Sequence, residues 1–425
     1  MASTTNGLTM LGSDKNGDII TAIEFGTSTT RVAIGVGGEE SLEILSHAEN
    51  PSDGAVVKGE LADMDKALAI LNKTTLEAEE AAGVDIAPNS VRIAVTGAHI
   101  TSRGGSGTMI VDGENKVVTE EDIREVENNA LKSVELSSDE KIIETFPETY
   151  ILDGKRRCDN PVNQIAHRLE AKVLALIGNR NQTDSFLHPL RESGFESPKA
   201  FFSGLCSAIP TVSDDEHEKG VVFIDMGAGT TEYAFLCRPS VLLAGVVPVG
   251  CDHMANDLSI ALNLPFSPIC QDLVLQAHAE TPDAFISLPG EYANRRVPKD
   301  TVSKVVEMRM RETFEIARSK FDAAGLLGRA GAGIVFTGGG SMLPKAPEIL
   351  RSVFDMPVRV AGTGLPENIS GATAGLDSPR YSTLLGVLIF GASTTSEASV
   401  LTKFDHGINS MLRKAWKNVT GAFKF

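Results

Sequence analysis

Aromatic residues and cysteines are scarce in this chain of 425 residues. Aromatic side chains fill 5% of its positions, and Trp416 is its only tryptophan. The five cysteines form no CxxC pair, and the two closest, Cys237 and Cys251, lie 14 positions apart (251 − 237). This spacing excludes a disulfide framework and favours reduced packing residues over a metal site. Hydrophobic residues still make up 42% of the chain, which predicts an ordinary globular protein of about two domains.

Positive charge is also in short supply. Lys and Arg number 39 against 56 Asp and Glu, a net charge of −17, so we expect no nucleic-acid partner. No uncharged apolar run approaches the roughly 20 residues that a membrane-spanning helix needs, and any membrane contact should be peripheral. Residues 1–14 lack the apolar segment of a secretory signal and are predicted to be a flexible leader. The sequence has no GxxxxGK[ST] motif, which excludes a Walker-type phosphate site.

What the sequence does contain is an internal repeat. Residues 19–34 and 221–236 each have a β-branched strand, an acidic residue, a turn of small residues and a second strand, which predicts two hairpins. Glycines let backbone N–H groups approach a polyphosphate, and hydroxyls add hydrogen bonds. One such hairpin is more often only structural, but two copies favour phosphate binding. The candidate phosphate-binding residues are Gly26, Thr27, Ser28, Thr29, Gly227, Ala228, Gly229, Thr230 and Thr231.

The acidic residues of the repeat, Glu24 and Asp225, occupy equivalent positions 201 residues apart (225 − 24). Each could hold a magnesium ion through water. A third glycine-rich element, Gly338, Gly339, Gly340 and Ser341, follows an apolar strand and precedes a helix that we expect to begin at Pro344. A strand, glycines and a helix N-terminus in this order are typical of a nucleotide contact.

Together these elements resemble the superfamily of actin, sugar kinases and heat-shock chaperone ATPases. Finer motifs resemble the FtsA family of bacterial cell-division proteins; they lie at residues 91–110, 118–123, 146–154, 160–162, 168–171, 248–258 and 379–388. The resemblance implies an α/β protein with the actin-like two-lobed ATPase fold, made of duplicated ribonuclease-H-like domains, and with an FtsA-type inserted subdomain.

The resemblance also implies a domain organisation. The first lobe comprises 15–88, 171–213 and a closing helix at 371–390; the inserted subdomain is 89–170; the second lobe core is 214–265 and 333–370, with a helical subdomain at 266–332; a linker at 391–406 precedes an amphipathic helix at 407–425.

For the site, the resemblance implies ATP and Mg²⁺ between the lobes, with Asp225 as the catalytic residue that orients the metal and the attacking water. Gly250, Arg309 and Glu312 resemble positions near the nucleotide, although a solvated charged face explains the last two equally well. The family pattern has Asp where this chain has Glu24. Residues 203–210 lack the Gln or Glu that superfamily ATPases use to position water. We therefore expect tight ATP binding with slow or negligible hydrolysis.

The carboxy-terminal residues 408–424 carry four basic residues and no acidic one, so the rest of the chain sums to −21 (−17 − 4). At 100° per residue its apolar side chains share one face, with Trp416 among them, which predicts an amphipathic helix on an anionic membrane. A final helix docked on its own domain is the alternative. The predicted membrane contacts are Ile408, Met411, Leu412, Arg413, Trp416, Lys417, Val419 and Phe423.

The FtsA resemblance implies a division protein on the cytoplasmic face of the cell membrane, peripheral and at the division site. It implies that the chain polymerises with itself and tethers FtsZ, whose carboxy-terminal peptide is expected at Arg295 and Arg296. A plain exposed loop is the alternative there. Other division proteins are expected on the inserted subdomain. The alternatives are a PilM-like pilus-assembly protein and, less favoured, a small-molecule kinase of the same superfamily.

Overall fold

Two sheets of the same topology form the body of the protein. The computed structural model describes residues 18–37, 41–113, 115–238, 240–278, 283–362, 364–365 and 368–393. In the first lobe the sheet order is β11-β6-β1-β2-β3-β19. Its strands are β1 (Asp18–Phe25), β2 (Thr29–Gly37), β3 (Leu42–Pro51), β6 (Val91–Val95), β11 (Lys199–Phe202) and β19 (Ile369–Gly371).

The second lobe repeats this pattern with the order β14-β13-β12-β17-β18, without a counterpart of β19 among its described residues. In each lobe the first three strands along the chain form an antiparallel meander, and two parallel strands follow beside the first. The strands are β12 (Val221–Met226), β13 (Thr231–Cys237), β14 (Ser240–Val247), β17 (Ile334–Thr337) and β18 (Val358–Val360). The sequence repeat is therefore the start of a duplicated domain.

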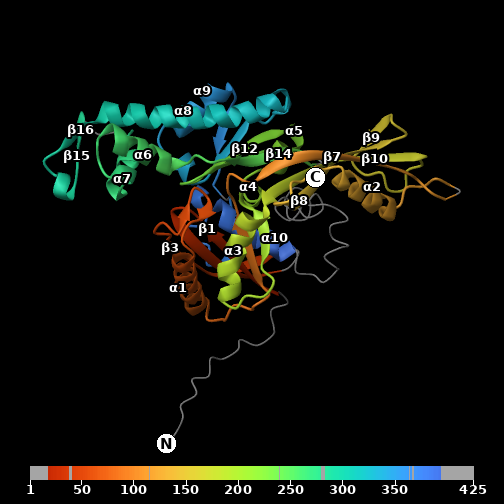
Figure 1. Cartoon of the computed structure of the whole chain (residues 1–425), viewed down its shortest axis with the longest axis horizontal. Helices are drawn as coiled ribbons and strands as arrows, with labels where there is room; N and C mark the ends of the chain where they lie inside the picture. The colour runs from red at the N-terminus through yellow and green to blue at the C-terminus, as the bar shows by residue number, and fades with distance from the viewer. Residues whose placement is uncertain are drawn as a thin grey trace, which may run out of the picture.

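A third sheet, of order β7-β10-β8-β9, projects from the first lobe (Figure 1). It follows β6 along the chain and ends just before the first lobe resumes. Its elements are β7 (Thr101–Ile110), α2 (Glu120–Lys132), β8 (Glu140–Leu152), β9 (Arg156–Cys158) and β10 (Arg168–Asn179). Helix α2 begins at a capping box in which Thr119 and Asp122 satisfy each other's backbone N–H groups.

Helices cover both lobes. The first lobe carries α1 (Met64–Ala82) and α3 (Arg180–Glu192), and the short hairpin of β4 (Val56–Val57) and β5 (Glu60–Leu61) precedes α1. The second lobe carries α5 (Asp214–Lys219), α6 (Cys251–Ala261), α7 (Pro268–Gln276), α8 (Lys299–Ala323), α9 (Ala346–Phe354), β15 (Phe285–Ser287) and β16 (Arg296–Pro298). The short 3-10 helices of the described ranges are η1 (Gly290–Tyr292), η2 (Leu327–Arg329), η3 (Gly339–Met342) and η4 (Pro379–Tyr381). The helix expected at Pro344 begins two residues later, because Lys345 adopts a left-handed φ of 63°.

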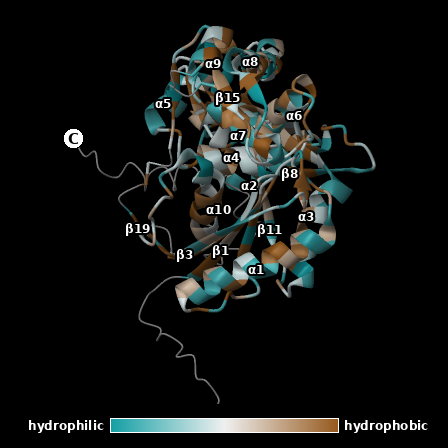
Figure 2. Ribbon diagram, turned by 90° about the vertical axis from the view of Figure 1, so that its left-hand side faces the viewer, coloured by the Kyte–Doolittle hydropathy of each residue, from teal (hydrophilic) through white to brown (hydrophobic). Residues whose placement is uncertain are grey.

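Two helices connect the lobes at their interface. Helix α4 (Ser203–Ala208) follows β11, and α10 (Ser382–Ser393) returns from the second lobe to pack on β1 and α4. Because α10 is apolar on almost every side, it is buried along its length, and Figure 2 shows it largely in brown.

Alternate residues of β12 face different cores: Val221 and Phe223 pack toward the first lobe and the inserted subdomain, whereas Val222 and Ile224 pack beneath the helices of the second lobe. None of the helices in the described ranges is long and apolar enough to cross a bilayer. The predicted leader at 1–14, residues 394–406 of the linker and the amphipathic helix at 407–425 lie outside the described residues.

Candidate functional site

The turns of the two repeated hairpins are closed by the same backbone hydrogen bond. Gly26 donates its N–H to the carbonyl of Thr29 at 3.0 Å, and Gly227 donates to Thr230 at 2.9 Å. Four further N–H groups of these turns make no backbone hydrogen bond within the described part of the chain: those of Thr27, Ser28, Ala228 and Gly229. Unsatisfied N–H groups in a turn are suited to an anion.

The two turns meet at the interface between the lobes. A Cβ atom placed on Gly229 would overlap Thr27 Oγ1 and would lie 3.0 Å from Lys58 Cα. The approach is therefore possible only because residue 229 has no side chain. The turn residues that the sequence analysis assigned to phosphate binding are thus brought to one place, from strands about 200 positions apart in the sequence (225 − 24 = 201).

The residue that lies directly opposite the acidic residue differs in charge between the two hairpins. In the first hairpin Glu24 pairs in register with Arg31, and in the second Asp225 pairs with Glu232. Arg31 donates to both carboxylate oxygens of Glu24 at 3.1 Å and to Glu49 Oε2 at 3.0 Å. The carboxylate of Glu24 is therefore engaged in an ion pair, whereas that of Asp225 faces a second carboxylate.

Asp225 and Glu232 are almost completely buried, at 6% and 5% exposure. Neither forms an ion pair with a basic side chain among the described residues. Burial, and then the charge of Glu232, raise the pKa of Asp225, and burial raises the pKa of Glu232 as well. Two uncompensated carboxylates in a buried site are unfavourable without a cation or a proton.

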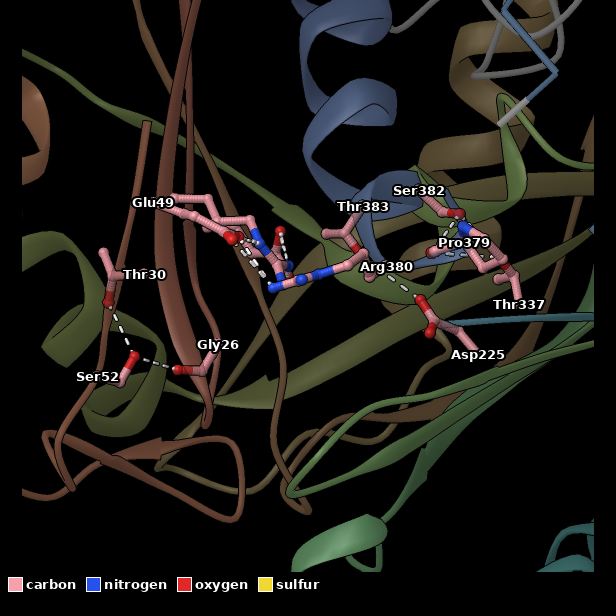
Figure 3. A network of polar contacts seen from close by, with 12 residues as sticks. Gly26, Thr30, Glu49, Ser52, Asp225, Thr337, Pro379, Arg380, Ser382 and Thr383 are labelled. Carbon is pink, nitrogen blue, oxygen red and sulfur yellow. Dashed lines mark hydrogen bonds and ion pairs between the residues drawn. The ribbon is translucent and has the colours of Figure 1, made fainter. Parts of the chain in front are cut away.

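Hydroxyl groups from the turn of this hairpin and from other segments hold the acidic pair. Thr383, in the first turn of α10, donates to Asp225 Oδ2 at 3.4 Å, as Figure 3 shows. Thr230 donates to Glu232 Oε1 at 2.8 Å, and Thr96, which follows β6 in the first lobe, donates to the same oxygen. The Thr96 hydrogen bond joins the first lobe to the second hairpin.

The triple glycine also reaches the acidic pair. Gly338 has a φ of 82°, and a Cβ atom on it would overlap Asp225 Oδ1. The hydroxyl of Ser341 donates to the carbonyl of Gly338 at 2.7 Å, so it stabilises this turn. Gly339, Gly340 and Ser341 belong to η3, directly after the glycine that contacts Asp225.

The other predicted nucleotide residues lie on α6 and α8. Gly250 precedes α6, and the next two N–H groups, of Cys251 and Asp252, donate to the carbonyls of Gly227 and Ala228 at 3.1 and 2.8 Å. The start of α6 thus supports the second hairpin. Arg309 donates to both carboxylate oxygens of Asp257 at 2.6 and 3.0 Å, and to Glu312 at 2.6 Å. Arg309 and Glu312 are therefore joined in one ionic cluster whose third member, Asp257, was not predicted.

The predicted partner-binding residues lie away from this site, in the helical subdomain. Arg295 donates to the carbonyl of Leu262 at 2.6 Å. The guanidinium of Arg296, in β16, lies 5.0 Å from the centroid of the Phe285 ring. Both side chains are exposed, so they remain accessible despite these contacts.

Sequence reasoning missed Glu232, Thr96 and Thr383. Glu232 could have been found by aligning the two halves of the repeat, because it stands seven positions after Asp225 (232 − 225), as Arg31 stands seven after Glu24 (31 − 24). Nothing in the sequence shows that the distant residues Thr96 and Thr383 reach the same carboxylates, because their positions depend on the contact between the lobes.

The donor set fits a nucleotide polyphosphate with magnesium. The N–H groups of the two turns and the hydroxyls of Thr27, Ser28 and Thr29 can donate to phosphate oxygens, whereas Thr230 and Thr231 already donate their hydroxyls to Glu232 and to the carbonyl of Val249. No group of three or more His, Cys, Asp or Glu side chains able to hold a metal occurs in the ranges that the structure describes. Magnesium does not need one, because it is usually held by one or two carboxylates together with phosphates and water.

Comparison with known proteins finds two matching family models. The SHS2 domain inserted in FtsA matches residues 97–177, and the model of the cell division protein FtsA matches residues 222–386. The chain is 28% identical to the cell division protein FtsA of Pseudomonas aeruginosa, over 91% of this chain and 92% of that protein. It is 27% identical to that of Borreliella burgdorferi, over 88% and 91%.

Two solved structures share the fold. A PilM-PilN type IV pilus biogenesis complex matches with a TM-score of 0.61 and 14% identity, over 88% of this chain and 98% of the other. MreB 5 of Spiroplasma citri bound to AMPPNP matches with a TM-score of 0.50 and 12% identity, over 94% and 98%. With the two family models, these likenesses confirm the expected actin-like fold with its inserted subdomain.

Proposed function

Because this chain belongs to the FtsA family of cell division proteins, we propose that it binds ATP and magnesium between its lobes and polymerises at the cytoplasmic membrane. There it tethers FtsZ filaments. The observation that supports nucleotide binding is the meeting of the two glycine-rich turns at Thr27 and Gly229. They lie beside a buried pair of carboxylates that forms no ion pair with a basic side chain of the described residues.

The two hairpins hold the phosphates in this proposal. The free N–H groups of Thr27, Ser28, Ala228 and Gly229 donate to phosphate oxygens, and the hydroxyls beside them complete the set. Magnesium, when bound, would supply positive charge that offsets the phosphates and polarises the terminal phosphate. Asp225 would hold the metal through water and would orient the attacking water. Glu24 joins this role only if it leaves Arg31, so we assign the main metal contact to Asp225.

The adenosine end of the nucleotide lies between the triple glycine and α8. Gly338, Gly339, Gly340 and Ser341 form one side of this binding region, and the cluster of Arg309 with Glu312 forms the other. Gly250 contributes by placing α6 against the second hairpin. Hydrolysis is slow, because residues 203–210 provide no water-positioning Gln or Glu and because one oxygen of Glu232 already accepts two threonine hydroxyls.

Membrane attachment is assigned to residues 407–425, which lie outside the described ranges. Four basic residues near an anionic surface contribute about 1 kcal/mol each, and about 4 kcal/mol corresponds to a dissociation constant near 1 mM. The apolar face adds to this, but a single helix still binds reversibly. Neighbouring copies in a polymer bind together and so gain by avidity, which makes polymerisation and membrane attachment depend on each other.

We assign the carboxy-terminal peptide of FtsZ to the surface around Arg295 and Arg296, and other division proteins to the inserted subdomain. Arg296→Ala should weaken binding of a labelled FtsZ peptide, measured by fluorescence anisotropy. The control is Arg329→Ala, which removes an arginine of η2 elsewhere in the second lobe. Equal affinity for the peptide in all three proteins would remove Arg296 from the assignment.

A PilM-like protein that docks on a membrane partner is the alternative, supported by the shared fold at a TM-score of 0.61. The basic carboxy-terminal segment distinguishes the two, because a protein recruited by a membrane partner does not need its own amphipathic anchor. A small-molecule kinase of the same superfamily is less favoured, because such an enzyme would turn ATP over readily and has no use for a membrane anchor.

Co-sedimentation with anionic vesicles tests the proposal. The full chain and a chain ending at Asp405 are compared with and without magnesium-ATP. The full chain should pellet with the vesicles, more completely with magnesium-ATP, and the shortened chain should stay in solution while it binds ATP with unchanged affinity. Equal pelleting of the two chains, or of neither, would favour the PilM-like protein or the kinase. A loss of ATP affinity in the shortened chain would instead make the tail part of the fold.

A further inference from the structure

A tight hairpin of the first lobe touches both phosphate-binding turns. Strands β4 and β5 are joined by Lys58 and Gly59 alone, with left-handed φ values of 53° and 75°. Two consecutive left-handed residues define the hairpin turn whose twist matches its strands, so the tip is held in a fixed conformation. The chain then enters α1, whose N-terminus is capped by Asp63.

Three contacts place this tip where the two lobes meet. Gly59 donates its N–H to Thr27 Oγ1 of the first hairpin at 3.3 Å. A Cβ atom on Gly59 would lie 2.8 Å from Thr230 Cγ2 of the second hairpin, and one on Gly229 would lie 3.0 Å from Lys58 Cα. Lys58 therefore belongs to the first lobe but lies against the turn of the second.

Lys58 also differs from the other cations around the site in having no acidic partner among the described residues. Arg31 is bound to Glu24 and Glu49, and Arg309 is bound to Asp257 and Glu312. The pKa of His253, in the first turn of α6 beside the second hairpin, is lowered by burial and next by the charge of Lys58. The ammonium group thus acts on the side of the site formed by the second lobe.

We propose that Lys58 binds the terminal phosphate of the nucleoside triphosphate and is the residue by which the site distinguishes the triphosphate from the diphosphate. This inference rests on the proposed nucleotide site. A lysine is a compact point charge on a long flexible stem, which suits a single phosphate group at the edge of a site. Because Lys58 and Gly229 come from different lobes, the bond to the terminal phosphate also favours the arrangement in which the lobes are in contact.

The test compares the affinities of Lys58→Met and the unaltered protein for ATP and ADP, each with magnesium, by calorimetry. Methionine has the same unbranched stem, so the backbone strain at a positive φ does not change. A charge-assisted contact of ordinary strength predicts a rise of about 10- to 100-fold in the Kd for ATP. The Kd for ADP should change less than about twofold, and Lys58→Arg should recover most of the ATP affinity.

The matched control is Lys66→Met, which removes a lysine paired with Asp63 on the exposed face of α1. It should leave both affinities unchanged. Equal losses for ATP and ADP in Lys58→Met, or no loss for either, would overturn the role of Lys58 while leaving nucleotide binding intact. If the unaltered protein bound neither nucleotide, the proposed function itself would be wrong, and the role of Lys58 with it.

Discussion

The acidic pair of the second hairpin predicts an effect on the free energy of unfolding that depends on pH. Asp225 and Glu232 stand directly opposite each other in the hairpin, where opposed side chains begin about 5 Å apart. At an effective dielectric constant of about 20, two like charges at this distance repel by about 3 kcal/mol. Glu232→Gln removes one of these charges and keeps an amide oxygen that can accept the hydroxyls of Thr96 and Thr230.

The repulsion exists only when both groups are ionised. The pKa of Asp225 is raised above its ordinary value, so the folded state holds a proton that the unfolded state releases. The folded state therefore binds more protons than the unfolded state between the two pKa values, and stability falls as pH rises through this interval. In magnesium-free buffer the unaltered protein should be less stable at pH 8 than at pH 6.

Glu232→Gln should therefore raise the free energy of unfolding by about 1–3 kcal/mol at pH 8, and by much less at pH 6. Urea denaturation followed by circular dichroism measures both values. Added magnesium should stabilise the unaltered protein more than the variant, because the cation offsets the same repulsion.

The first hairpin provides the matched control. Glu24→Gln removes a carboxylate at the equivalent position, but there the opposed residue is Arg31. Breaking this pair leaves a buried guanidinium with less compensation, so the control should be destabilised at both pH values. Equal destabilisation of both variants at both pH values would refute the claim that Asp225 and Glu232 repel each other.

Three further predictions concern single residues. Gly338→Ala should weaken ATP binding and destabilise the protein by about 1–3 kcal/mol, measured by calorimetry and urea denaturation, because the methyl group overlaps Asp225 Oδ1 and the φ of 82° is unfavourable for alanine. Asp225→Ala should reduce the magnesium dependence of ATP binding and of polymerisation; unchanged values would contradict its assigned role. Glu127, whose pKa burial raises to about 7, should titrate near neutral pH by carboxyl NMR, and Tyr150→Phe should raise that pKa further by removing the hydroxyl donor.

The duplicated fold could be predicted from the sequence because the repeat determines local structure. Strand, glycine turn and strand are determined by residues within about 16 positions, and both copies form hairpins closed by the same N–H to carbonyl bond. The triple glycine also follows its predicted strand. The start of α9 was misplaced, because nothing in the sequence marks Lys345 as left-handed.

The contacts between the lobes could not be predicted from the sequence in this way. Thr96 and Thr383 reach the second hairpin from segments about 136 and 158 positions away from their partners Glu232 and Asp225. Threonine is a common residue type, and the sequence around Thr96 and Thr383 contains no motif that marks them as donors to a carboxylate. Only the tertiary packing brings their hydroxyls to a carboxylate. The same holds for the tip at Lys58 and Gly59. Its turn depends on local sequence, but its contact with Gly229 depends on tertiary packing and cannot be predicted from the sequence.

The two hairpins have the same strand pairing, but the residues opposite their acidic residues differ in charge. This difference gives the two lobes different roles. In the first lobe the acid is neutralised within the protein by Arg31, so this hairpin is stable without a ligand. In the second lobe Asp225 faces Glu232 instead, and the missing positive charge has to come from a proton or a bound cation. Because one copy of the duplicated unit is compensated and the other is not, the proposed magnesium ion is expected at the second hairpin rather than the first. Lys58, carried by the first lobe, lies against the turn of the second hairpin, so the proposed binding of the terminal phosphate would depend on the contact between the lobes.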